Sequence, residues 1–414
     1  MTIIVVKTSP QQYSGETNIL IGGDYFPRLD TDTKDVVSSQ LKQIISGASL
    51  ATVNLEAPIQ VEESNPQPKY GPTLALGSND LETLLSTGFD MVNLANNHIM
   101  DYGEEGLRET IQYCDKIGLQ YTGAGRTRDQ ALELNVIDTG GQRIGIINAG
   151  DKEFGVATSE KPGYAWMGDP ILPEKITKAS RKVDVLVLIL HGGIEYEPIP
   201  AIQRQDLYRQ FANAGADVIL GHHPHVPQGW EVYDGTPICY SLGHFLFDFR
   251  QKYRKPKTEW GLLADIQLDG NSITNVILRP IEQQQSGPRV QFLSEKSDRL
   301  KYLQQSRAVI NNREKFTSLW QALAIQRYED YYQDRLDRSL ITKSRTESDE
   351  HLRWLQNVSQ CEAHRWCIQT ATSVLGGTCR DERGGESHKR LEQLREYTQQ
   401  SLLDRIKQQI CAMV

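Results

Sequence analysis

Short apolar runs rich in Val and Ile alternate with amphipathic stretches over the first two thirds of the chain. These runs lie at residues 19–23, 51–55, 90–95, 143–149, 183–190, 216–220 and 237–242. Near-continuous apolar runs of this length are typical of strands that are buried on both faces. A hairpin is predicted over residues 261–280, because alternating apolar residues flank the turn residues Asp269 and Gly270.

Helical spacing separates these runs. Residues 103–118 place Leu107, Ile111 and Cys114 on one face, and Leu207 and Phe211 line a second helix. Alternation of strands and helices predicts a layered α/β fold in which helices cover the faces of the sheet.

The residue composition and the spacing of apolar residues change after about residue 282. Residues 290–414 are rich in Gln, Arg, Glu and Lys, and their apolar residues keep helical spacing. Two Gly-Gly pairs within residues 370–390 predict a loop there. We therefore expect an α/β domain over residues 18–281 and a mostly helical C-terminal extension over residues 282–414.

Composition narrows the class of protein. Among 414 residues, 38% are hydrophobic and 24% are charged, which is typical of a soluble globular chain. A net charge of −8 gives no indication of nucleic-acid binding. No apolar stretch approaches the length of a membrane span, so we expect a cytoplasmic protein without one. Six cysteines without a CxxC pair favour reduced thiols.

Five of the predicted strands run directly into side chains able to bind a metal. These side chains are Asp24, Glu56, Asn97, His191, and the pair His223 and His225. Sites in open α/β sheets form at the carboxyl ends of strands, where the following loops converge. Imidazole, carboxylate and amide donors suit Zn²⁺, Mn²⁺ or Fe²⁺, and the absence of Cys argues against a structural zinc site.

A centre of two metals is expected. Such centres need a bridging carboxylate, for which Asp24 and Glu56 are the candidates, and the H-x-H pair can direct one ring to each ion. The expected chemistry is activation of water and polarisation of a phosphoryl or carbonyl oxygen.

Three further residues are candidate substrate-binding groups. Glu195 follows His191 in HGGIEYEP, where it can support the histidine, contact substrate, or be a solvated loop carboxylate. Arg126 stands in GAGRTRDQA, which can receive an anion at a helix N-terminus or be a plain glycine turn. His222 precedes the H-x-H pair.

The ordered motifs resemble the CapA family of capsule and poly-γ-glutamate synthesis proteins. They are GD (23–24), VNLE (53–56), GFDMVNLANNHIMDYGEEGL (88–107), GAG…A (123–131), LHGGIEY (190–196) and GADVILGHHPHVPQGWEVYDGTPICYSLGHFLFD (215–248). The resemblance covers about residues 18–281 and implies the four-layer α/β/β/α sandwich of calcineurin-like metallophosphoesterases. It also implies that the six ligand candidates occupy a dinuclear site and that His98 is the catalytic or leaving-group-facing histidine.

One motif departs from the family, which usually reads SLGNF where this chain has SLGHF. His244 replaces an amide with a group able to carry a proton near neutral pH. We therefore take His98, Asp24 and His244 as the catalytic candidates. The helical extension lies outside the resemblance. Its role is open among three: a lid, a surface for a protein partner or self-association, and a solvated appendage.

Three functions follow. The first is a metal-dependent, hydrolase-like enzyme of the CapA type in capsule or poly-γ-glutamate-like polymer synthesis, acting by hydrolysis or transfer at a phosphoryl or acyl centre. The second is a peptide epimerase of ribosomal peptide biosynthesis, in which two proton-transfer groups face one Cα. The third is a non-catalytic accessory protein of polymer synthesis. The substrate is a small molecule, a peptide or a polymer.

Overall fold

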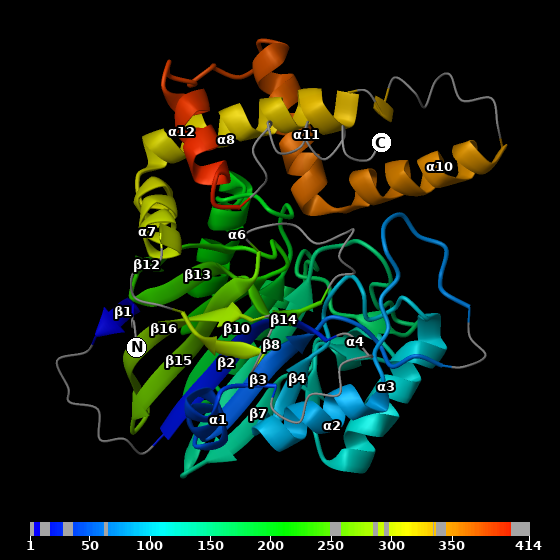
Figure 1. Cartoon of the computed structure of the whole chain (residues 1–414), viewed down its shortest axis with the longest axis vertical. Helices are drawn as coiled ribbons and strands as arrows, with labels where there is room; N and C mark the ends of the chain where they lie inside the picture. The colour runs from blue at the N-terminus through cyan, green and yellow to red at the C-terminus, as the bar shows by residue number, and fades with distance from the viewer. Residues whose placement is uncertain are drawn as a thin grey trace.

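Two β-sheets pack face to face, and a group of C-terminal helices gathers at one end of the molecule (Figure 1). The computed structural model describes residues 4–8, 17–27, 36–61, 65–248, 258–284, 289–293, 298–333, 335–336 and 345–398.

Within the described residues the first sheet has nine strands. Along its main path they are β1 (Ile4–Thr8), β16 (Ser272–Gln283), β15 (Trp260–Asp269), β2 (Thr17–Phe26), β3 (Leu50–Leu55), β4 (Met91–Asn93) and β5 (Gln120–Thr122). Off this path, β17 (Val290–Phe292) pairs with β16, and β14 (His244–Phe247) pairs in parallel with β2. The predicted hairpin is present as β15 and β16. The β14–β2 pairing sets His244 opposite Asp24.

The second sheet has six strands in the part of the chain that the structure describes. In order they are β12 (Pro227–Tyr233), β13 (Thr236–Leu242), β11 (Val218–His222), β10 (Val185–His191), β8 (Gln142–Gly150) and β7 (Asn135–Thr139). Neighbours from β8 to β13 run parallel, so β10 and β11 bring His191 and His222 side by side at their carboxyl ends. A small two-stranded sheet pairs β6 (Ala124–Gly125) with β9 (Gly163–Tyr164).

Three buried clusters define four layers. Between the sheets, Ile21 of β2 lies in one apolar core with Val187 of β10. The outer face of the first sheet packs on α1 (Ser39–Ser46), α2 (Ser78–Thr87) and α3 (Gly103–Ile117). The outer face of the second sheet packs on α5 (Leu172–Ser180) and α6 (Ile202–Asn213), and α4 (Arg128–Ala131) is a short turn of helix. The expected α/β/β/α sandwich is confirmed.

The C-terminal region is mostly helical, as predicted. Its elements are α7 (Asp298–Ile310), α8 (Arg313–Arg327), the π-helical turn η2 (Tyr328–Gln333), α10 (Arg345–Gln360), α11 (Glu362–Leu375) and α12 (Ser387–Arg395). The loop predicted over residues 370–390 is wrong at both ends, since α11 extends to Leu375 and α12 begins at Ser387. Strand β17 lies beyond residue 281, and the division into two domains stays a prediction.

The helices are docked on the sheets rather than solvated. Buried Trp320 and Trp354 belong to the same apolar core as the inner faces of the sheets. The Glu197 carboxylate, which follows β10, is buried and is bonded by Arg327 of α8 and Arg395 of α12. Within the described segments, no helix is long and apolar enough to cross a membrane.

Candidate metal centre

The strand ends converge as the sequence predicts. Asp24 lies within β2, Glu56 follows β3, and His191 ends β10. All six predicted ligands are buried, with exposures of 0–7%: Asp24, Glu56, Asn97, His191, His223 and His225. Their assignment as ligands stays a prediction, and the structure places them in one cluster.

Asn54 connects the members of this cluster. Its Nδ2 donates to Asp24 Oδ1 at 2.8 Å and lies 3.4 Å from Glu56 Oε2 and 3.2 Å from His191 Nδ1. Asn96 in turn donates to Asn54 Oδ1 at 3.2 Å. Sequence reasoning missed Asn54, although it lies in the VNLE motif, because a polar residue inside a buried strand has no signal of its own.

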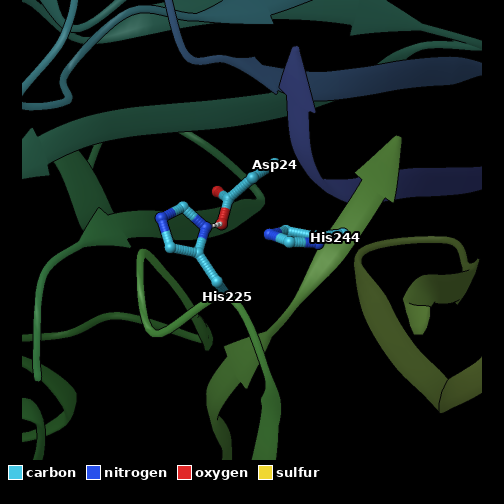
Figure 2. A group of neighbouring side chains, drawn as sticks. All are labelled: Asp24, His225 and His244. Atoms are coloured by element: carbon cyan, nitrogen blue, oxygen red, sulfur yellow. Dashed lines mark ion pairs between the residues drawn. The ribbon is translucent and has the colours of Figure 1, made fainter. Parts of the chain in front are cut away.

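The donor atoms form two groups. Asp24, His225 and His244 make one, and Glu56, His191 and His223 make the other, each with ligand atoms within 4.8 Å of one another. Figure 2 shows the first group, in which His225 Nδ1 lies 3.3 Å from Asp24 Oδ2. In the second group His223 Nδ1 lies 3.1 Å from His191 Nε2, which is also 3.1 Å from Asn97 Oδ1.

The H-x-H segment is held in a strained backbone. His223 and His225 have φ of 93° and 57°, a region that costs a residue with a side chain about 1–3 kcal/mol and recurs at functional sites. Tyr196, from the loop after β10, supports the turn: its N–H donates to the Pro224 carbonyl at 2.8 Å, and its ring lies 5.8 Å from that of His225.

Burial and mutual repulsion favour neutral imidazoles. Burial lowers the pKa of His191 and of His223 well below the ordinary value, and the other histidines add to the effect. Burial alone would raise the pKa of Asp24, but the hydrogen bond and charge of His225 hold it below its usual range. Burial and the charge of Asp24 raise the pKa of Glu56. Neutral His191 and His223 rings beside an ionised Asp24 are in the protonation states that metal ligands need.

His98 lies beside the cluster in a separate polar contact. Its Nδ1 is 2.7 Å from Asp101 Oδ2 and 3.0 Å from Lys69 Nζ. Lys69 also pairs with Asp101 and lies 5.2 Å from the centre of the Phe154 ring. Burial lowers the pKa of His98, Lys69 lowers it further, and Asp101 opposes both. Sequence reasoning missed Lys69 because it comes from an irregular segment with no periodic pattern.

Glu153 is an acidic residue beside the cluster that the sequence reasoning also missed. Its Oε2 lies 3.4 Å from Asn97 Nδ2, and its Oε1 lies 3.7 Å from His223 Nε2. Burial and the charge of Asp151 raise its pKa to about 8. The signal was available, because the strand over residues 142–150 also ends at acidic residues.

The three candidate substrate-binding residues fall in different places. His222 is fully buried, and its Nε2 lies 2.9 Å from the Gly22 carbonyl oxygen, which gives it a contact between the two sheets. Glu195 is half-buried, and its charge raises the pKa of Glu56 and of Glu153. Arg126 is exposed on a cavity of about 1060 Å³ beside α3, whose lining includes none of the six ligand candidates.

The fold and the cluster together define a class: a two-sheet α/β protein with a buried His and carboxylate centre at its strand ends. The family described as "Bacterial capsule synthesis protein PGA_cap" matches residues 9–249, more than half of the chain. This chain belongs to that family.

The curated relatives align with this chain over only part of their own lengths. "Capsule biosynthesis protein CapA" of Bacillus anthracis is 30% identical over 263 residues, 62% of this chain and 63% of that protein. "PGA biosynthesis protein CapA" of Bacillus subtilis is 32% identical over 218 residues, 52% and 57% of the two chains. A "Probable polyglutamine synthesis accessory protein" of Mycobacterium tuberculosis is 28% identical over 38% of this chain and 44% of its own. The chain thus spans less than two thirds of these relatives.

Solved structures are more distant. A putative 5′-nucleotidase of Staphylococcus aureus has a TM-score of 0.41 at 14% identity and covers 71% of this chain and 58% of its own. A phosphatase of Mycoplasma pneumoniae has a TM-score of 0.40 at 16% identity, with coverage of 64% and 93%.

Proposed function

We propose that this chain is a metal-dependent enzyme of capsule or poly-γ-glutamate-like polymer synthesis, acting by hydrolysis or transfer at a phosphoryl or acyl centre. The observation that carries the proposal is the pair of adjacent donor groups, because six buried carboxylate and imidazole side chains converge there. Family membership supports the polymer context.

The donor set fits divalent metal ions. Glu56 Oε1 is buried and lacks a hydrogen-bond partner, which is costly for a carboxylate unless a cation faces it. The other donors are nitrogen and oxygen atoms without thiolate, which suits Zn²⁺, Mn²⁺ or Fe²⁺ in a catalytic site. Asp24, Glu56, Asn97, His191, His223 and His225 would hold the ions. When bound, such ions polarise a phosphoryl or carbonyl oxygen and lower the pKa of water.

The residues of the chain supply proton transfer and orientation. Lys69, which also pairs with Asp101, donates to Nδ1 of His98, and this contact places the ring proton of a neutral His98 on Nε2. His98 gives that Nε2 proton to the departing oxygen or nitrogen. Lys69 balances the charge of Asp101, and both fix the direction of the ring.

Metal analysis of the purified protein tests the proposal, together with hydrolysis of model phosphodiesters and γ-glutamyl amides after Mn²⁺, Zn²⁺ or Fe²⁺ is restored. We expect bound metal and metal-dependent turnover. His223→Ala should lose turnover and bind less metal, and the surface variant Glu174→Gln should keep both. A wild-type chain that binds no ion and hydrolyses neither substrate class with any of these metals sinks the proposal.

A second candidate is isomerisation of a peptide. The observation that favours it is that His244 and Asp24, two proton-transfer groups, share one buried group (Figure 2). Solvent deuterium at a peptide Cα, lost in His244→Ala and insensitive to chelators, would support it, and an absence of exchange would exclude it.

A third candidate is an accessory role without catalysis, which the name of the Mycobacterium relative favours. Polymer synthesis that survives His223→Ala and His225→Ala in cells would establish it. Synthesis that stops in both variants, with protein levels unchanged, would exclude it.

A further inference from the structure

We infer that His244 is a metal ligand, which with Asp24 and His225 completes an ion position next to that of Glu56, His191 and His223. The inference rests on the proposed function, since it requires that the centre binds metal. It changes the role predicted for His244 from proton carrier to ligand.

The backbone delivers His244 to the centre. Strand β14 pairs with β2 so that His244 faces Asp24, and the register shifts before Leu246 pairs with Tyr25. The Asp24 N–H donates to the Gly243 carbonyl at 2.9 Å, which ties the two residues together. A register irregularity of this kind re-aims a side chain, and here it directs His244 between the sheets.

The ring is oriented with one nitrogen left for a ligand. His244 is 2% exposed, stacks on Phe247 with 4.6 Å between ring centroids, and has a hydrogen bond with the backbone of Thr258. Because its Nε2 is buried without a partner, the Thr258 contact uses Nδ1. Metal-binding histidines commonly donate their second ring N–H to a carbonyl, which fixes the tautomer and leaves a lone pair on the other nitrogen.

The direction of the ring agrees with this assignment. Figure 2 shows a ring nitrogen of His244 directed toward the Asp24 carboxylate and His225. The donor atoms of these three residues lie within 4.8 Å of one another. Ligands around one ion with bonds of 2.0–2.2 Å are roughly 3.3–3.6 Å apart. The 3.3 Å between His225 Nδ1 and Asp24 Oδ2 already meets this value, so only the His244 side needs to contract.

Ligand number makes His244 necessary. Without it, the first group holds only Asp24 and His225, whereas catalytic zinc sites use three protein ligands. Glu56 Oε1 lies 3.7 Å from His191 Nε2 and 3.6 Å from His225 Nε2, which is the opposite ring nitrogen to the Nδ1 that faces Asp24. Glu56 therefore groups with His191 and His223 and does not take the place of His244 in the first group.

The test measures metal binding rather than turnover. The full-length protein is stripped with a chelator and dialysed against Mn²⁺ or Zn²⁺ alone, and bound metal per chain is determined by elemental mass spectrometry. We expect two ions in the wild type and one in His244→Ala, with the affinity of the position beside Asp24 and His225 reduced at least about tenfold. His98→Ala is the matched control, because it removes a neighbouring imidazole outside both donor groups, and it should keep two ions.

Spectroscopy adds a second readout. Two Mn²⁺ ions in adjacent positions give an exchange-coupled electron paramagnetic resonance spectrum, which His244→Ala should convert to that of an isolated ion. His244→Asp serves if the Ala variant does not fold. A carboxylate ligand should raise the Mn²⁺ to Zn²⁺ affinity ratio of one position, and an unchanged ratio overturns the assignment.

The outcomes separate the two claims. A folded His244→Ala that binds as many ions as the wild type with equal affinity overturns the assignment of His244 and leaves the proposed function intact. A wild type without any ion refutes both.

Discussion

Replacing Glu197 with Gln tests whether the C-terminal helices hold the loop beside the candidate metal centre. The Glu197 carboxylate is fully buried and lies 2.9–3.0 Å from nitrogens of Arg327 and Arg395. Removing one partner of a buried ion pair costs about 3–5 kcal/mol, because the remaining charge stays buried without compensation. At about 2 cal/mol/K of unfolding entropy per residue, this corresponds to a melting temperature lower by about 3–6 °C if the chain unfolds as one unit.

Glu174→Gln is the matched control. Glu174 also pairs with a cation, Lys178, but both side chains are 66% exposed, so we expect no measurable shift in melting temperature. The assay is thermal and urea unfolding followed by circular dichroism, with hydrogen exchange over residues 192–200 as a local readout. Equal melting temperatures for the wild type and Glu197→Gln, or equal losses in the two variants, would refute the reasoning.

Three further outcomes are expected. Burial lowers the pKa of His364 to about 3, so between pH 6.5 and 3 the unfolded chain binds a proton that the folded chain does not. The free energy of unfolding therefore falls as the pH drops through this window. In urea titrations His364→Gln should reduce the dependence of this free energy on pH by up to about 1.4 kcal/mol per pH unit, and an equal dependence in wild type and variant would contradict it. Lys69→Met should cut turnover at least about tenfold with metal content unchanged, because a cation near Asp101 orients His98. Lys69→Arg should recover part of this turnover. Loss of metal in Lys69→Met would instead give Lys69 a structural role. Native alkylation mapped by mass spectrometry should modify exposed Cys379 and spare buried Cys114, Cys239, Cys361 and Cys367, and rapid labelling of any of these four would contradict the packing.

The sequence predicts the sheets and the six-residue cluster because both depend on local patterns. Buried parallel strands read as apolar runs, and a polar residue directly after such a run must lie at the edge where sites form. Asp24, Glu56 and His191 were identified in this way, and the structure brings them together.

What the sequence did not predict depends on contacts distant along the chain. Lys69 reaches His98 from an irregular segment, and Glu197 meets Arg395 across 198 residues, so no periodicity reports either. His222 and His223 are adjacent at the end of β11 but lie in different environments, because the backbone conformation changes between them. His222 still points toward β2, whereas the positive φ of His223 turns its ring into the cluster.

The bond between Glu197 and Arg395 has a consequence for synthesis on the ribosome. All seven donor residues have been translated once His244 is added, but Arg395 follows 151 residues later, and only then can α12 engage the loop after β10. At the 5–20 residues per second at which ribosomes work, this delay is on the order of 10–30 seconds. Through that interval the candidate ligands exist without α12, so the contact between Arg395 and Glu197 can form only after all of them have been synthesised.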